Sequence, residues 1–168
     1  MLTGSMASNF WGIPRTTHDL DFVVTYGPEK VAEIVAALED GFFLDEASVR
    51  HACRAPYMFN AIDQRSALKV DFWTLRPGAF EQQMFARRLR VILFGEPAWI
   101  ATAEDTLLHK LHWERITPSE RQLGDAAGIV AVQQADLDRD YLERWARELH
   151  VEARLRDLLS GKIRPKST

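Results

Sequence analysis

The spacing of apolar residues changes near residue 102, and this change constrains the fold more than any other feature of the chain. Before it, short runs rich in β-branched and aromatic residues alternate with turn formers, which is typical of strands. These runs are Leu20–Val24, Pro56–Ile62, Ala67–Leu75 and Leu89–Phe94, and two of them are expected to form a hairpin. After residue 102, leucines recur at helical spacing. The chain should therefore combine a sheet with a helical C-terminal region.

Helices are predicted from periodicity and from capping residues. One interrupts the strand-rich part: Pro28 suits its first turn, an apolar stripe follows, and Gly41 ends it. Thr102-x-x-Asp105 resembles a capping box, and Ser119 can cap a second C-terminal helix. The predicted C-terminal helices begin at Thr102, run from Ser119 to about Gln133, and continue over 139–149 and 151–159.

These elements predict an α+β fold with a small mixed sheet of about four or five strands, which carries the site on one edge. An α/β core is expected over residues 1–101, and a helical region over 102–168 that packs on the core as one unit. Only three residues precede Gly4, whereas a strand normally has about five. The first strand therefore looks truncated, which leaves open a native start upstream of Met1.

Composition excludes several classes of protein. With 168 residues, 46% hydrophobic and 27% charged, the chain is the size of one ordinary soluble domain. No apolar run is long enough to span a bilayer and no signal peptide is recognisable, so a cytoplasmic protein without membrane contact is expected. The single cysteine excludes an internal disulfide and a thiolate zinc site. A net charge of −3 argues against binding duplex DNA by bulk electrostatics.

Two carboxylates share one face of a predicted strand. Side chains alternate along a strand, so Asp19 and Asp21 project from the same side, roughly 6–7 Å apart. Like charges on an otherwise apolar strand repel unless a cation bridges them. Mg²⁺ takes oxygen ligands and commonly uses one or two carboxylates together with substrate phosphates. An isolated Asp-x-Asp also occurs in metal-dependent glycosyltransferases and as plain surface polarity, so the pair alone does not decide between these.

Two further features fit a nucleotide. Asp71 stands between apolar residues on a later strand; beside the first strand, it would complete three carboxylates able to hold two metals or to accept a hydroxyl proton. Gly4 lets backbone N–H groups approach a phosphate, and Ser5 adds a hydroxyl donor. The sequence therefore predicts a metal-dependent site for a phosphorylated substrate.

The joint pattern resembles a known superfamily. Gly4-Ser5, a gap of thirteen residues, Asp19-x-Asp21 with apolar residues following, and the later Asp71 are similar to the hallmark pattern of polymerase β-like nucleotidyltransferases. Residues 2–21 are similar to small bacterial members of the minimal nucleotidyltransferase and AbiEii types, which occur in toxin–antitoxin and phage-defence systems. The resemblance covers about residues 2–75 and is weaker beyond 102.

The resemblance implies a Mg²⁺-dependent transfer of a nucleoside monophosphate from ATP or another NTP to a hydroxyl of a protein or RNA acceptor, with pyrophosphate leaving. It makes Asp19, Asp21 and Asp71 the catalytic carboxylates and metal ligands, with two Mg²⁺ ions, and gives the terminal phosphates to Gly4 and Ser5. A cognate toxin or a tRNA is an acceptor of the kind such relatives use. On the helices, Lys110, Arg121 and Asp125 are similar to positions near the nucleotide.

Each of these residues also has a plainer interpretation. Arg15 can approach a phosphate or anchor an acidic neighbour, and Lys110 can simply reach solvent. Arg121 and Asp125 are four apart and can form a surface ion pair. His109-x-x-His112 lacks a third zinc ligand, and Cys53 is expected to be inert. The alternative function is a catalytically weak module of the same fold that binds a toxin, a nucleotide or RNA.

Overall fold

The computed structural model describes residues 1–54 and 57–165, and the chain divides into two compact units. Unit 1 contains residues 1–3 and 17–100, and unit 2 contains residues 4–16 and 101–165 of the described chain. The change of unit at Ile100–Ala101 lies at the change in apolar spacing. The sequence did not indicate that residues 4–16 would belong with the helices.

Unit 1 is built on a mixed seven-stranded sheet with the order β3-β4-β5-β2-β1-β7-β6. The prediction of four or five strands is wrong, because the sheet also includes two strands of only two residues each. The prediction of a site on one edge is wrong as well, because β2 lies in the middle of the sheet. The strands are β1 (Leu2–Thr3), β2 (Asp19–Val24), β3 (Phe42–Phe43), β4 (Met58–Asp63), β5 (Lys69–Thr74), β6 (Leu89–Leu93) and β7 (Glu96–Ile100).

The predicted hairpin is the antiparallel pair β4–β5, which pairs Asn60 with Asp71. Pro56, where the first of its predicted runs begins, lies outside the described residues. β5 pairs with β2 in parallel, and β2 pairs with β1 in antiparallel fashion. Residues opposite one another in paired strands project to the same face, so this register decides which side chains meet.

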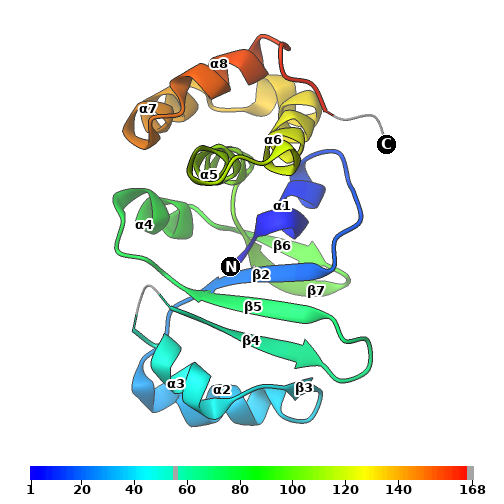
Figure 1. The fold of residues 1–168 in the computed structure, drawn as a ribbon, viewed down its shortest axis with the longest axis vertical. Coiled ribbons are helices and arrows are strands. Elements are labelled where there is room, and N and C mark those ends of the chain that lie inside the picture. The colour runs from blue at the N-terminus through cyan, green and yellow to red at the C-terminus, as the bar shows by residue number, and fades with distance from the viewer. Residues whose placement is uncertain (55–56, 166–168) are drawn as a thin grey trace. The chain divides into compact units, whose positions relative to one another are not determined.

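One face of the sheet is apolar and packs on two helices. Phe59 of β4 and Phe72 of β5 stack with ring centroids 4.7 Å apart. They belong to a cluster with Val31 and Val49, which come from the helices α2 (Val31–Leu38) and α3 (Glu46–Ala52). Figure 1 shows these two helices beside β3 and β4. The predicted helix after Pro28 is confirmed; it begins as a 3-10 turn, η1 (Pro28–Lys30).

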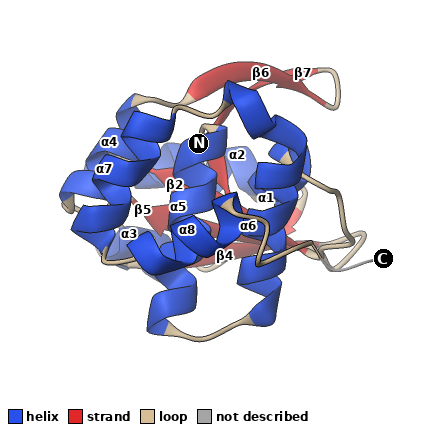
Figure 2. Ribbon diagram, turned by 90° about the horizontal axis from the view of Figure 1, so that it is seen from above, coloured by secondary structure: helices blue, strands red, loops and turns tan. Residues whose placement is uncertain are grey.

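The remaining part of unit 1 is α4 (Ala79–Ala86) followed by a hairpin of β6 and β7, which run side by side in Figure 2. The two-residue turn at Phe94 and Gly95 has positive φ at both positions (53° and 87°), as a type I′ turn requires. β7 was not predicted, because Pro97 is a residue that strand interiors disfavour. β7 joins the sheet through one pair, Leu2 with Ile100.

Unit 2 is helical. It contains α1 (Gly4–Trp11), α5 (Ala103–Ile116), α6 (Glu120–Gln133) with the 3-10 turn η2 (Gln134–Asp136), α7 (Arg139–Leu149) and α8 (Glu152–Leu159). The predicted helix starts are confirmed by their caps: the hydroxyls of Thr102 and Ser119 accept hydrogen bonds from the N–H groups of Asp105 and Gln122.

α1 was not predicted, since Gly4-Ser5 was interpreted as a turn. Gly4 has a φ of +62°, which glycine adopts without strain.

α1 packs against α5 and α6 through a close backbone approach. A Cβ on Gly12 would lie 2.7 Å from the backbone nitrogen of Ile129. The Trp11 indole N–H donates to the Ala101 carbonyl, and the Gln133 amide donates to the Trp11 carbonyl, both at 2.7 Å. These bonds fix the segment after α1 within unit 2. Trp11 is therefore held in place by bonds at both its side chain and its backbone.

Candidate functional site

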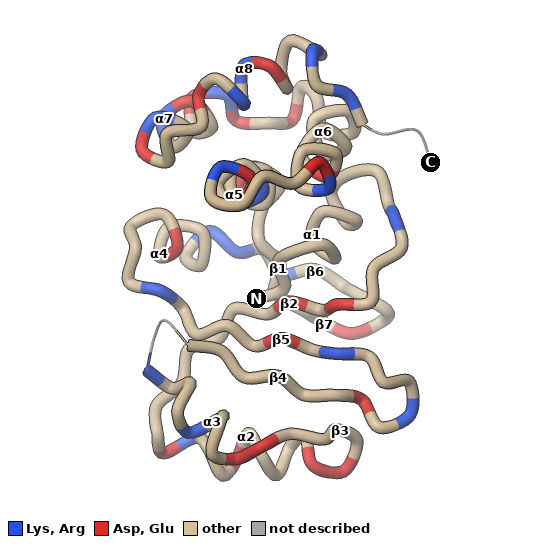
Figure 3. Tube along the Cα trace, viewed as in Figure 1, with Lys and Arg blue, Asp and Glu red and all other residues tan. Residues whose placement is uncertain are grey.

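Asp21 and Asp71 lie directly opposite each other on neighbouring parallel strands, β2 and β5. Neighbouring strands are about 4.8 Å apart, so the two carboxylates project side by side from one face. The same register pairs Asp19 with Lys69 on that face. Figure 3 shows the acidic positions of β2 and β5 side by side, with a basic position on β5 next to them. β5 thus lies where the sequence interpretation required.

Lys69 neutralises part of this cluster. Its Nζ lies 2.8 Å from Asp71 Oδ2, with the Lys69 side chain 44% exposed and that of Asp71 9% exposed. The hydrogen bond to Asp71, together with the negative charges of Asp71, Asp19 and Asp21, raises the pKa of Lys69 above its ordinary value, although burial opposes this. Lys69 therefore carries a positive charge attracted by all three carboxylates.

A polar row crosses the sheet at this level. Thr3 on β1 lies opposite Asp21, which lies opposite Asp71, which lies opposite Asn60 on β4. Asp21 Oδ1 accepts a hydrogen bond from the Trp73 indole at 3.4 Å. Thr3 Oγ1 and Asp71 Oδ1 are buried and have no hydrogen-bond partner among the described residues. Two buried polar atoms on either side of Asp21 thus lack the partners that buried groups normally have.

Sequence reasoning missed Thr3, Asn60 and Lys69. Asn60 stands between buried Phe59 and Ala61, so period-two alternation indicates its face. Nothing in the sequence gives the strand register, and only the register brings Asn60 and Thr3 into the row of Asp21 and Asp71.

The donor set fits a hard divalent cation in its chemistry. Carboxylate oxygens of Asp21 and Asp71 are adjacent, and the unpartnered Asp71 Oδ1 and Thr3 Oγ1 are oxygen atoms that magnesium accepts as ligands. Within residues 1–54 and 57–165, no three His, Cys, Asp or Glu side chains are grouped as a metal site requires. Asp71 Oδ2 is instead bound to Lys69.

Asp125 is the centre of a second charged cluster, in unit 2. Its Oδ1 accepts from Arg15 Nε at 2.6 Å, while its Oδ2 accepts from an Arg15 terminal nitrogen and from Lys110 Nζ, both at 2.8 Å. Burial alone would raise the pKa of Asp125, but the hydrogen bonds and charges of Arg15 and Lys110 outweigh it and lower that pKa below its ordinary value. Asp125 therefore stays ionised although its side chain is only 5% exposed.

Ser5 belongs to the same cluster. An Arg15 terminal nitrogen donates to Ser5 Oγ at 2.9 Å, and the Asn9 side chain bonds both the N–H and the carbonyl of Arg15. Of the residues predicted to contact the nucleotide, Ser5, Arg15, Lys110 and Asp125 form one network, with Gly4 adjacent in the chain. Asn9, which positions Arg15, was missed because its role depends on the loop conformation.

The other candidate residues have ordinary environments. Arg121 is exposed, whereas Asp125 is buried against Arg15 and Lys110, so the plainer interpretation of these two residues as a surface ion pair does not describe Asp125. His109 Nε2 accepts a hydrogen bond from the Trp113 indole at 2.8 Å. Cys53 Sγ donates to the Arg50 carbonyl.

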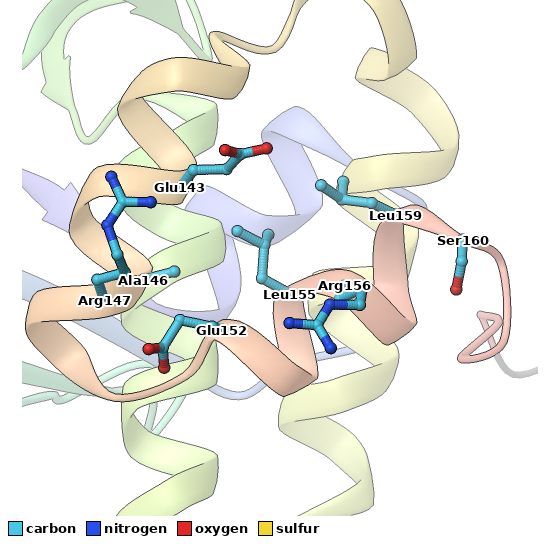
Figure 4. Close-up of a pocket in the computed structure, with 8 residues that line it drawn as sticks. All are labelled: Glu143, Ala146, Arg147, Glu152, Leu155, Arg156, Leu159 and Ser160. Carbon is cyan, nitrogen blue, oxygen red and sulfur yellow. The ribbon is translucent and has the colours of Figure 1, made fainter.

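A pocket of about 690 Å³ lies between α7 and α8 (Figure 4). Its lining includes the apolar Ala146, Leu155 and Leu159, with Arg147 and Arg156 also present. None of the sequence-predicted site residues lines it. Among the described residues, no helix has both the length and the apolar content needed to cross a membrane.

The fold resembles that of one solved nucleotidyltransferase-like protein. A crystal structure of an antigenic nucleotidyltransferase-like protein from Paracoccidioides brasiliensis matches with a TM-score of 0.53 and 14% identity, covering 99% of this chain and 85% of the other. The solution structure of the antibiotic-resistance factor ANT(2'')-Ia has a TM-score of 0.47 and 14% identity, covering 96% and 80%. No family model and no curated protein matches the sequence. The chain thus has a nucleotidyltransferase-like α+β fold, as predicted.

Proposed function

We propose that this protein is a metal-dependent nucleotidyltransferase that moves a nucleoside monophosphate from ATP or another NTP to a hydroxyl of a protein or RNA acceptor. The observation that carries the proposal is the register of Asp21 with Asp71 on adjacent parallel strands of a nucleotidyltransferase-like fold. Adjacent carboxylates with an unpartnered buried oxygen favour cation binding over plain surface polarity.

Asp19, Asp21 and Asp71 are the residues proposed to hold Mg²⁺, with two ions as the resemblance implies. When bound, the metal supplies positive charge that neutralises phosphate oxygens and stabilises the charge developing on them. Burial of Asp71 and Thr3 strengthens any charge interaction there, because the local dielectric is lower than that of water.

The proposed reaction is an in-line displacement. The acceptor hydroxyl oxygen forms a bond to the α-phosphorus, the bond from that phosphorus to the bridging oxygen breaks, and pyrophosphate leaves with the electron pair. The hydroxyl proton passes to a carboxylate, and Asp71 is the candidate because its Oδ1 is free to accept one.

The cluster in unit 2, taken by itself, contains the residues that the proposal assigns to phosphate binding. Arg15 and Lys110 are cations held in place by Asp125, and fixed cations bind anionic oxygens without further ordering cost. Ser5 presents a hydroxyl beside Arg15. In this proposal Asp125 positions the two cations rather than contacting a phosphate itself.

Labelled NTPs test the proposal. Incubation of the protein with α-³²P-labelled ATP, GTP, CTP and UTP, Mg²⁺, and separate protein and RNA fractions should give one labelled acceptor and release pyrophosphate. Asp21→Asn and Asp71→Asn should each lower the rate by about a hundred- to a thousandfold, the size expected when charge stabilisation of the transition state is lost. Asp40→Asn, at an exposed position outside the sheet, should leave the rate unchanged.

The identity of the labelled acceptor tests the finer parts of the proposal. A labelled protein partner or a labelled tRNA would support a role in a toxin–antitoxin or defence system. Nucleotide binding without transfer, at a level that Asp21→Asn leaves unchanged, would overturn the enzyme proposal and favour a binding module of the same fold.

A further inference from the structure

A lysine side chain lies among the carboxylates of β2 and β5. Lys69 lies opposite Asp19 in the β2–β5 register, two residues before Asp71 on the same face, and its Nζ is 2.8 Å from Asp71 Oδ2. Its ammonium is thus placed among the carboxylates that the proposed function assigns to Mg²⁺. A divalent cation would bind the same oxygen atoms as this ammonium, and the two positive charges repel each other. The two cations therefore compete for the site.

A second observation indicates that the Lys69 ammonium leaves buried oxygen atoms on this face of the sheet without hydrogen-bond partners. Thr3 is only 3% exposed, yet its hydroxyl oxygen has no hydrogen-bond partner among the described residues, and the same holds for Asp71 Oδ1. Both lie in one row with Asp21 between them. A buried oxygen without a partner costs free energy, which a ligand on this face would recover.

We infer that Lys69 is a resident counter-cation of the carboxylate cluster, which a divalent cation must displace from Asp71, and that Lys69 thereby sets the metal affinity of the site. This inference rests on the proposed function, since it concerns the same carboxylates. Without metal, Lys69 offsets the repulsion between Asp19, Asp21 and Asp71. With metal bound, the 44% exposed Lys69 side chain turns toward solvent and leaves both Asp71 oxygens to other partners.

Binding of Mn²⁺ alone, followed by electron paramagnetic resonance of the free ion, tests the inference without any turnover. Lys69→Met should bind Mn²⁺ about tenfold or more tightly than the unchanged protein, as expected for removing one unit charge beside a divalent cation in a partly exposed site. Lys69→Arg keeps the charge and should bind Mn²⁺ within about twofold of the unchanged protein.

Lys30→Met is the matched control, because Lys30 also forms a short ion pair in unit 1, with Glu33, but on the exposed surface of η1 and α2. It should leave Mn²⁺ affinity unchanged. Lys69→Gln provides a second neutral variant if Lys69→Met does not fold, and its far-ultraviolet circular dichroism should match that of the unchanged protein.

The outcomes separate this inference from the proposed function. If the unchanged protein binds Mn²⁺ and both neutral variants bind it equally or less tightly, the role of Lys69 is overturned. The nucleotidyltransferase proposal then still stands. Absence of Mn²⁺ binding by every variant overturns both. Tighter binding by Lys69→Met together with unchanged binding by Lys30→Met supports the inference, whatever acceptor the enzyme uses.

Discussion

Asp125 carries a buried negative charge on which two cations depend. Replacing it with Asn would leave Arg15 and Lys110 without their carboxylate, and loss of one partner from a buried ion pair costs about 3 kcal/mol. We therefore expect Asp125→Asn to lower the free energy of unfolding at pH 7 by about that amount in urea denaturation. Asp157→Asn, which removes an exposed pair with Lys162, should change it by less than about 1 kcal/mol.

The same carboxylate predicts a pH dependence. The pKa of Asp125 is lower in the folded protein than in the unfolded chain, where an aspartate has a pKa of about 3.9. Its stabilising contribution is therefore complete above about pH 5 and is lost as the pH falls through the folded pKa. The difference in unfolding free energy between the unchanged protein and Asp125→Asn should shrink between pH 5 and the acid limit of folding. A difference that stays constant with pH would contradict this assignment.

At the scale of elements, the N-cap of α5 has a defined energetic role. Thr102 Oγ1 accepts the Asp105 N–H and donates to Asp105 Oδ2 at 2.8 Å, in a buried position. Thr102→Ala should lower the free energy of unfolding by about 1–2 kcal/mol, the usual cost of losing such a cap. Thr102→Ser keeps the hydroxyl and should recover most of this loss in the same urea titration. Equal losses in both variants would show that the methyl group, not the cap, matters.

Two glycines test the packing of α1 on α6. A Cβ at position 12 would lie 2.7 Å from the Ile129 nitrogen and 2.8 Å from the Gly128 carbonyl carbon, and backbone atoms cannot move aside easily. Gly12→Ala should therefore destabilise unit 2 by about 1–3 kcal/mol. Gly124, in α6, has nothing within 4 Å of a built Cβ, so Gly124→Ala should stabilise by about 0.5–1 kcal/mol. Thermal melting of both variants distinguishes close approach from a general effect of alanine.

Local signals in the sequence predict many of these elements, but not how they pair. Thr102 and Ser119 indicated their helices because a cap depends only on neighbouring residues. The role of Lys69 was not predicted. Asp71 is two residues away on the same strand, but only the β2–β5 register places Lys69 opposite Asp19. A register follows from tertiary packing, so periodicity alone does not reveal it.

At the scale of the whole molecule, the predicted site residues fall into two groups by unit. Asp19, Asp21 and Asp71 belong to unit 1, whereas Gly4 and Ser5 belong to unit 2. The sequence order suggested one continuous α/β core, because a strand, a Gly-Ser turn and a second strand follow each other closely. The close approach of α1 to α6 at Gly12 assigns residues 4–16 to the helices instead, and no local pattern encodes that approach.

Ligand-linked stability is the property of the intact protein that tests the proposed site most directly. Mg²⁺ with an ATP analogue that cannot be cleaved at the α-phosphate should raise the melting temperature, because a ligand that binds only the native state stabilises it by about 2.7 kcal/mol at a hundred times its Kd. For a chain of this size that corresponds to roughly 5–10 °C. The measurement is differential scanning fluorimetry with metal alone, analogue alone and both.

Asp21→Asn should abolish this gain, because it removes a proposed metal ligand, while its metal-free melting temperature should equal or exceed that of the unchanged protein because carboxylate repulsion is relieved. Asp40→Asn should retain the full gain. If the unchanged protein melts at one temperature with and without Mg²⁺ and the analogue, the carboxylates of β2 and β5 do not form a metal–nucleotide site. If Asp21→Asn keeps the gain, the nucleotide binds without this row, and the charges around Asp125 remain as its site.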